Sequence, residues 1–223
     1  MNRFKTYTGG ALETNCFLYE TPVGNILFDA PEGADAAFAD TRVDLLLLTH
    51  GHFDHVADGA AIIRRHGCKT AFHADTIPMV GERDFFRKWG FAQEVEPFAA
   101  DFLIEEGPGE FLGEALRVFL VPGHCPGSLC FLLPGERVLV GGDVLFRGGV
   151  GRWDLPGGNR DILFDGIRRK LLPLDEDVVV LPGHGPATTI GRERAENPFL
   201  TEERNLSSTE IRPASTVKSR TTL

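Results

Sequence analysis

The amino-acid sequence predicts an α/β fold in which sheets pack face to face and helices lie outside them. Three features carry this prediction. Short apolar strands fall in two successive blocks, and each block includes helical segments. A nearly continuous apolar run over residues 43–49 is typical of a strand that is buried on both faces. Residues 159–172 carry Leu163, Ile167 and Leu171 at helical spacing, which predicts the clearest helix of the chain.

The first block contains strands that are separated by turn residues. The predicted strands cover residues 4–7, 16–20, 24–29, 43–49 and 69–72. Residues 56–66 predict a helix, because Val56, Ala60 and Ile63 recur at helical spacing and Gly67 is a favourable residue at a helix end. Residues 76–89 predict a weaker helix that is interrupted near Pro78 and Gly81.

The second block repeats the pattern. Its predicted strands, residues 116–121, 129–133 and 137–140, alternate with Pro-Gly turns, and the helix over residues 159–172 leads to a last apolar strand over residues 177–181. A chain of 223 residues can bury a substantial core within one domain, which we place at residues 1–200. Residues 201–223 are rich in Ser and Thr and poor in large apolar side chains, so we expect a disordered tail.

Composition excludes several classes of protein. The net charge is −9 and the domain has no basic run, so we do not expect a nucleic-acid partner. The apolar runs are too short to cross a bilayer, and no signal peptide is predicted. The four cysteines show no CxxC spacing, which favours reduced thiols in a cytoplasmic protein. The oligomeric state stays open at this point.

One seven-residue segment is dense in metal-binding side chains. His50, His52, Asp54 and His55 lie between the apolar strand and the first predicted helix. In an extended chain, residues two apart point to the same side, so His50 and His52 can grip one ion together. Asp54 and His55, at the entrance of the helix, can address a neighbouring ion. Imidazole and carboxylate are ligands that suit Zn, Fe or Mn.

Three more candidate ligands follow predicted strands. His124, Asp143 and His184 each come after a strand and beside glycine or proline, where a rigid sheet can present side chains into a cleft. Five of the seven histidines fall in these segments. A single His-x-His pair is more often structural, but so many imidazoles could hardly converge without an ion to satisfy them. The sequence therefore predicts a metal centre.

These motifs resemble those of the metallo-β-lactamase-fold hydrolases, and within them the glyoxalase II (hydroxyacylglutathione hydrolase) group. The likeness covers nearly all of residues 1–200. The matching segments are His50-x-His52-x-Asp54-His55, Gly123-His124-x-Pro126-Gly127-Ser128, Gly142-Asp143-Val144-Leu145-Phe146, residues 149–158 and residues 196–200. The resemblance implies a four-layer αβ/βα sandwich with the metals at one edge. It is closest to the short bacterial type, which lacks the C-terminal helical domain that contributes much of the glutathione site in full-length glyoxalase II.

The resemblance also implies roles for single residues. His50, His52 and His124 would hold one divalent ion, and Asp54, His55 and His184 would hold a second. Asp143 would bridge both ions, and Asp54 and Asp143 would act in catalysis with a metal-bound hydroxide. Asp29 matches an aspartate that supports the ligands, and Arg152 matches a position that contacts the thiol carrier. We expect zinc, with iron or manganese as alternatives.

The expected reaction is hydrolysis of a thioester, S-lactoylglutathione or a related acyl-thiol, by a metal-bridging hydroxide. A thiolate leaves easily, so no strong general acid is needed. One alternative is a mononuclear-iron persulfide dioxygenase of the same fold, which would use only the equivalents of His50, His124 and Asp143. A lactonase or other ester hydrolase, and a non-catalytic metal-binding module, are further alternatives.

Overall fold

Two six-stranded sheets form the centre of the molecule. The computed structural model describes residues 3–201. Of the tail expected at residues 201–223, only residue 201 lies within this range. The first sheet has the strand order β1-β2-β3-β4-β5-β6. Its strands are β1 (Phe4–Gly9), β2 (Thr14–Thr21), β3 (Gly24–Phe28), β4 (Leu45–Leu47), β5 (Lys69–Phe72) and β6 (Phe102–Leu103). β3, β4, β5 and β6 run parallel, and β1, β2 and β3 are antiparallel neighbours.

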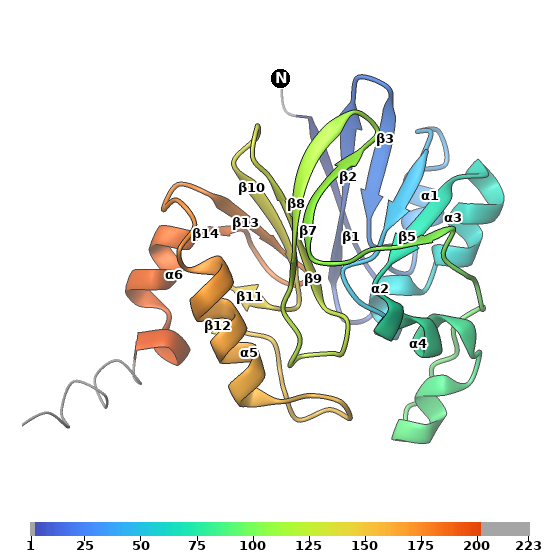
Figure 1. Ribbon diagram of the computed structural model, residues 1–223. Helices are drawn as coiled ribbons and strands as arrows, with labels where there is room; N and C mark the ends of the chain where they lie inside the picture. Colours follow the sequence, from blue (N-terminus) through green and yellow to red (C-terminus); the bar gives the residue numbers. More distant parts are fainter. Residues whose placement is uncertain (1–2, 202–223) are drawn as a thin grey trace, which may run out of the picture.

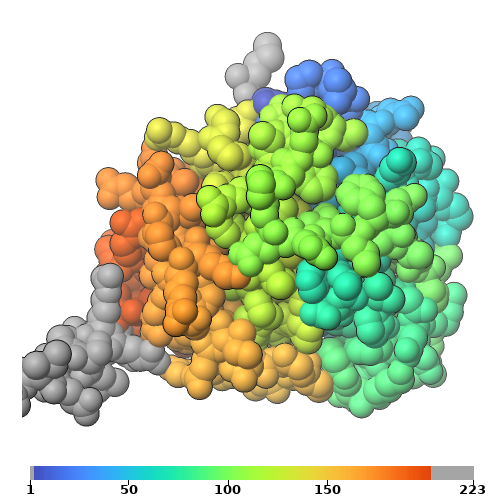
Figure 2. Space-filling model, in the orientation of Figure 1, coloured from blue at the N-terminus to red at the C-terminus, as the bar shows by residue number. Residues whose placement is uncertain are grey.

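The second sheet has the order β14-β13-β10-β9-β8-β7. Its strands are β7 (Gly107–Phe111), β8 (Glu114–Leu120), β9 (Leu129–Leu133), β10 (Val138–Gly142), β13 (Val179–Pro182) and β14 (Thr188–Thr189). β10 and β13 are parallel, and the other neighbours are antiparallel. A small hairpin of β11 (Leu145–Phe146) and β12 (Gly149–Val150) stands apart. The hairpin of β7 and β8 crosses the front of the molecule (Figure 2).

Helices cover the outer face of each sheet (Figure 1). Outside the first sheet lie α1 (Ala34–Ala37), α2 (Phe53–Val56), α3 (Gly59–His66), α4 (Ile77–Gly81) and two 3₁₀ turns, η1 (Ala74–Thr76) and η2 (Phe85–Trp89). Outside the second lie α5 (Arg160–Gly166), continued by the π-helical turn η3 (Ile167–Leu171), and α6 (Ile190–Glu196). Within residues 3–201, no helix combines the length and apolarity that a membrane span requires.

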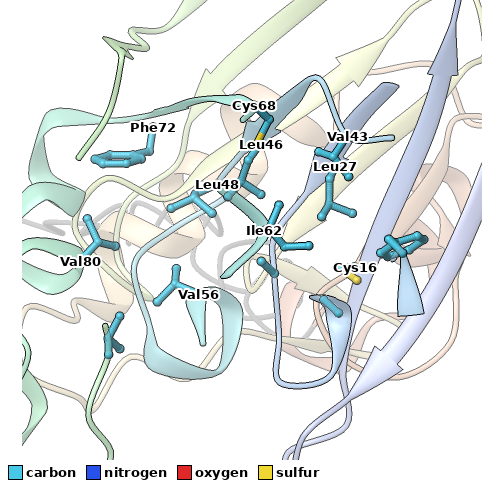
Figure 3. Packing of buried hydrophobic residues seen from close by; sticks show 14 of the residues in the cluster. Cys16, Leu27, Val43, Leu46, Leu48, Val56, Ile62, Cys68, Phe72 and Val80 are labelled. Atoms are coloured by element: carbon cyan, nitrogen blue, oxygen red, sulfur yellow. The ribbon is translucent and has the colours of Figure 1, made fainter. Parts of the chain in front are cut away.

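Three buried clusters hold the four layers together. Phe17, Phe28 and Leu47 of the first sheet meet Leu129 and Phe131 of the second in the central cluster, and the rings of Phe28 and Phe131 are 5.4 Å apart. A second cluster packs the first sheet against its helices, with Leu27 and Leu46 near Ile62, and Phe72 nearer Val80 (Figure 3). The third packs α5 and α6 against β10 and β13. The predicted four-layer sandwich is confirmed.

The helix predicted over residues 56–66 is confirmed for residues 59–66, which form α3, but Val56 belongs to the preceding short helix α2. α2 ends at Val56 and α3 begins at Gly59, after Asp58. The Asp58 carboxylate accepts hydrogen bonds from the backbone N–H groups of Gly33 and Asp35, so this residue ties the helix junction to α1. Residues 76–89 also divide, at Gly81, but Pro78 lies in the first turn of α4, where its missing N–H is not needed.

Candidate metal centre

The candidate metal centre lies at the edge of the sandwich where strands of both sheets end. Asp29 directly follows β3, and His50 lies three residues beyond its parallel neighbour β4. Asp143 directly follows β10, and His184 lies two residues beyond β13, which is parallel to β10. Neighbouring parallel strands end at the same edge of a sheet, so the fold brings these residues together.

The structure brings three imidazoles together in a first group, formed by His50, His52 and His124. One nitrogen of each lies within 4.8 Å of the others. The Nε2 atom of His124 is 2.9 Å from Nδ1 of His52. All three side chains are buried, so these ring nitrogens face one another with little access to water.

A second group contains Asp54, His55 and His184. Its ligand-capable atoms also lie within 4.8 Å of one another. Asp54 Oδ2 is 3.3 Å from His184 Nε2 and 3.6 Å from His55 Nε2. Asp54 and His55 belong to α2, so one short helix directs both side chains toward His184 from the opposite sheet.

Asp143 lies between the two groups. Its Oδ1 atom is 3.2 Å from His55 Nε2, and its Oδ2 atom is 3.5 Å from His124 Nε2 and 3.4 Å from His184 Nε2. One carboxylate thus faces imidazoles of both groups, as a residue that bridges two ions would.

Four of the five imidazoles are oriented through Nδ1. The Nδ1–H groups of His124 and His184 can donate only to their carbonyl partners, Arg152 O at 2.8 Å and Leu12 O at 3.0 Å. His55 Nδ1 donates to Asp29 Oδ2 at 2.8 Å, and His50 Nδ1 lies 3.1 Å from the Thr49 hydroxyl. When these rings are neutral, this pattern places the proton on Nδ1 and directs the lone pair of Nε2 toward the centre, which is the tautomer that metal binding needs.

Asp29 supports the first sheet's side of the centre. Its carboxylate accepts hydrogen bonds from the Thr49 N–H, the Thr49 hydroxyl and His55 Nδ1, at 2.7, 2.7 and 2.8 Å. Because the Thr49 hydroxyl donates to Asp29, its oxygen can accept from His50 Nδ1. Asp29 therefore orients His55 directly and His50 through Thr49. It adopts a left-handed backbone conformation with φ of 63°, which Asp tolerates better than most residues.

The N-terminal hairpin supports the second group. The hydroxyl of Thr14 donates to Asp54 Oδ2 at 2.7 Å, and Thr14 forms a backbone bridge to His184. The side chain of Asn15 donates to the carbonyls of Pro182 and Gly185, at 3.0 and 2.9 Å. β2 of the first sheet thereby holds the loop of the second sheet that carries His184.

Gly183 leaves room for this arrangement. A Cβ atom at that position would overlap Asp143 Oδ1 and lie 2.6 Å from His55 Cε1. Glycine is therefore needed before His184 because two candidate ligands approach the backbone closely, and not because of backbone strain.

Charge divides the centre into two parts. Burial lowers the pKa of His50 and His124 and lowers the pKa of His52 to about 3, and for His50 and His52 the neighbouring imidazoles add to this effect. Burial also opposes the charge of His184, but the hydrogen bonds that it donates to Asp143 and Asp54 outweigh burial and raise its pKa to about 10. The pKa of His55 is raised, against burial, by Asp143, Asp54 and Asp29. The carboxylates thus favour a positive charge on one side of the centre, and the imidazoles of the first group stay neutral on the other side.

The donor set fits a divalent metal ion. Within residues 3–201, the buried side-chain atoms without a hydrogen-bond partner include Nε2 of His50, His52 and His55 and Oδ1 of Asp143. Buried polar atoms nearly always have a partner, so such a group marks a place for one. Imidazole nitrogens and carboxylate oxygens around a negative site are ligands for a Zn, Fe or Mn ion.

A pocket of about 510 Å³ opens onto the candidate ligands. Aromatic side chains from residues 85–91, which the sequence analysis did not single out, line it together with Phe53 and Phe146. The aromatic residues Phe85, Phe86, Trp89 and Phe91 follow one another closely in the sequence, which was the available signal. Arg152 also lines the pocket, and both oxygens of Asp154 accept hydrogen bonds from its guanidinium group at 2.8 Å.

Cys125 lies beside His124 but faces the core. It is buried with its Sγ 3.5 Å from Met79 Sδ, and burial raises its thiol pKa to about 12. With this pKa, Cys125 stays a thiol near neutral pH, which fits a packing role.

The comparisons with known proteins establish the family. Residues 9–184 match the model of the Metallo-beta-lactamase superfamily, and the chain belongs to that superfamily. Hydroxyacylglutathione hydrolase GloC of Haemophilus influenzae is 37% identical over 171 residues, which are 72% of this chain and 77% of the relative.

Two solved structures are similar over most of their length. The BLEG-1 B3 metallo-beta-lactamase is 33% identical with a TM-score of 0.83, over 89% of this chain and 99% of that one. TTHA1623, solved in a di-iron-bound form, is 38% identical with a TM-score of 0.79, over 88% of this chain and 100% of that one.

Proposed function

We propose that this protein is a thioester hydrolase that works with two divalent metal ions and acts on S-lactoylglutathione or a related acyl-thiol. The observation that carries the proposal is the convergence of seven candidate ligands, five of which line a pocket, with four imidazoles oriented so that Nε2 faces the centre. The relative named hydroxyacylglutathione hydrolase supports the thioester as the scissile bond.

In this proposal each ion has its own ligand set. His50, His52 and His124 hold one ion, Asp54, His55 and His184 hold the other, and Asp143 binds both. The donor chemistry suits zinc, and the similar protein in a di-iron form makes iron the alternative to test first. A mononuclear-iron dioxygenase would not need Asp54, His55 and His184 as ligands, so their convergence favours two ions.

When bound, the ions would supply Lewis acidity and lower the pKa of a coordinated water. The chain itself supplies position and charge. Burial opposes the charge of Asp143, but its imidazole neighbours lower its pKa well below the usual range, so the carboxylate stays ionised and can accept a hydrogen bond from an attacking water. The aromatic side chains that line the pocket would flank the reacting carbonyl with apolar surface. A thiolate leaving group needs no proton from the protein.

The decisive experiment is to purify the protein without chelator, count the metals per chain by elemental analysis, and assay two reactions. We expect close to two metals and loss of the S-D-lactoylglutathione thioester. One iron with oxygen uptake on glutathione persulfide would instead place the protein among the dioxygenases. Loss of neither substrate, with metals bound, would favour a lactonase or a non-catalytic module.

A further inference from the structure

We propose that the pocket selects thioesters whose acyl group is apolar and ring-sized, and that Trp89 and Phe91 determine this specificity. The inference rests on the proposed thioester hydrolysis and names the substrate class that the site prefers. The acyl group would lie against an aromatic wall, which we define as Phe53, Phe86, Trp89 and Phe91.

The aromatic wall begins at a candidate ligand. The ring of His52 lies 6.1 Å from that of Trp89 and 6.5 Å from that of Phe86, in edge-to-face geometry. A group attached to a carbonyl carbon near His52 would therefore touch the wall within about one ring's length. The segment that carries Trp89 lies below α4 in Figure 1.

Packing fixes the wall in place. Phe86 is buried, and its ring lies 5.5 Å from those of Trp89 and Phe53. Phe91 packs on Phe53 at 5.8 Å. Trp89 and Phe91 remain partly exposed, so each has apolar surface that a ligand can cover. The wall is thus a preformed apolar surface with its rings already ordered, which favours binding of a rigid apolar group.

Charge in the pocket disfavours selection through an anionic carrier. Among the pocket-lining residues in the described part of the chain, Arg152 is the one charged side chain apart from the candidate ligands. Nε and Nη2 of its guanidinium group donate to Asp154, so part of its charge is already balanced. The neighbouring cations of the aromatic segment, Arg87 and Lys88, pair with Glu94 and Glu82. A carrier with carboxylates, such as glutathione, would have to compete with these acidic partners for the same cations, so we expect apolar contact to contribute more to substrate preference than the carrier does.

The test compares thioesters that differ in one part at a time. S-lactoylglutathione and S-phenylacetylglutathione share the carrier, and phenylacetyl-N-acetylcysteamine keeps the acyl group on a small neutral carrier. We expect kcat/KM to be about ten- to a hundredfold higher for phenylacetyl than for lactoyl on glutathione. We also expect the two phenylacetyl thioesters to agree within roughly threefold, because the carrier contributes little.

Variants test whether the aromatic wall determines the preference for an apolar acyl group. Trp89→Ala and, separately, Phe91→Ala should lower kcat/KM for the phenylacetyl thioesters by about tenfold and for S-lactoylglutathione by less than about twofold. Phe102→Ala, an exposed aromatic residue outside the pocket, is the matched control. Asp154→Asn, which releases Arg152, should lower KM for both glutathione thioesters and leave KM for the neutral carrier unchanged.

The outcomes separate the two proposals. If the metal-loaded protein hydrolyses none of the thioesters, the proposed function itself fails. If it hydrolyses S-lactoylglutathione at least as well as the phenylacetyl thioester, or if both wall variants lower the two activities equally while keeping their metals and unfolding midpoint, the specificity proposal is overturned and the proposed function stands.

Discussion

The two halves of the sandwich supply the candidate centre in different ways. The first half contributes His50, His52, Asp54 and His55 from one strand-to-helix connection, and the side chains of Asp29 and Thr49 orient two of them. The second half contributes one residue from each of three loops, and backbone carbonyls orient its two imidazoles. Support by a side chain can be removed by substitution, whereas support by a carbonyl cannot. The two halves should therefore respond differently to mutation.

Asp143→Ala should have the largest effect, because the carboxylate of Asp143 faces imidazoles of both groups. We expect the variant to lose most of its metal and nearly all activity, a larger loss than the roughly 10- to 100-fold that removal of a ligand's hydrogen-bond partner causes. Elemental analysis and the thioester assay measure both effects. A variant that kept two metals would refute the bridging role.

Asp29→Asn should weaken metal binding by about 10- to 100-fold. Asn tolerates the left-handed backbone, but its NH₂ group cannot accept the hydrogen bonds that Asp29 Oδ2 accepts from Thr49 and His55. Arg152→Ala is the control from the other half, because the carbonyl that orients His124 remains. Competition with a chromophoric chelator gives the affinities. If the two variants lost metal affinity equally, the two halves would not differ in how they support their ligands.

The metal-free protein should lose stability as pH rises. The pKa of His184 is raised from 6.5 to about 10, so its contribution is fully present below pH 6.5 and is lost as pH approaches 10. Metal ions would replace the proton, so the loaded protein should show little change over this range. Unfolding midpoints at pH 6.5, 8 and 9.5, with and without chelator, measure the difference. Parallel curves for the two forms would count against a shared site for proton and metal.

Thr14→Val should have the smallest effect. It removes the hydroxyl that donates to Asp54 Oδ2 but preserves the shape of the side chain. A hydrogen bond to a charged group contributes about 1.5–3 kcal/mol, and the partly accessible Asp54 can recover part of this from water, so we expect about a tenfold loss in affinity for one of two ions. Stepwise metal titration by calorimetry would detect it. If the affinities of the tighter and the weaker metal-binding step both fell, Thr14 would not act on the second group alone.

The position of the aromatic wall depends on tertiary structure and not on local sequence pattern. Residues 85–91 contain four aromatic residues, but the sequence predicts only a weak helix over residues 76–89. Their position beside His52 follows from the path of η2 after α4, and local pattern does not report such a path. In the same way, Thr14 supports Asp54 across 40 positions of sequence.

By itself, the sequence determined the α/β class, most strands and the identity of the seven candidate ligands. The reason is local: hydrophobic periodicity reports which face of an element is buried, and the His-x-His-x-Asp-His spacing reports a cluster that one turn of chain can present. The tertiary structure alone decided the division of residues 53–66 into α2 and α3, the tautomers of four imidazoles and the shape of the pocket. Each of these depends on partners far away in the chain, such as Asp58 with α1 and His184 with Leu12, and only the packing of the two sheets brings those partners within hydrogen-bond distance.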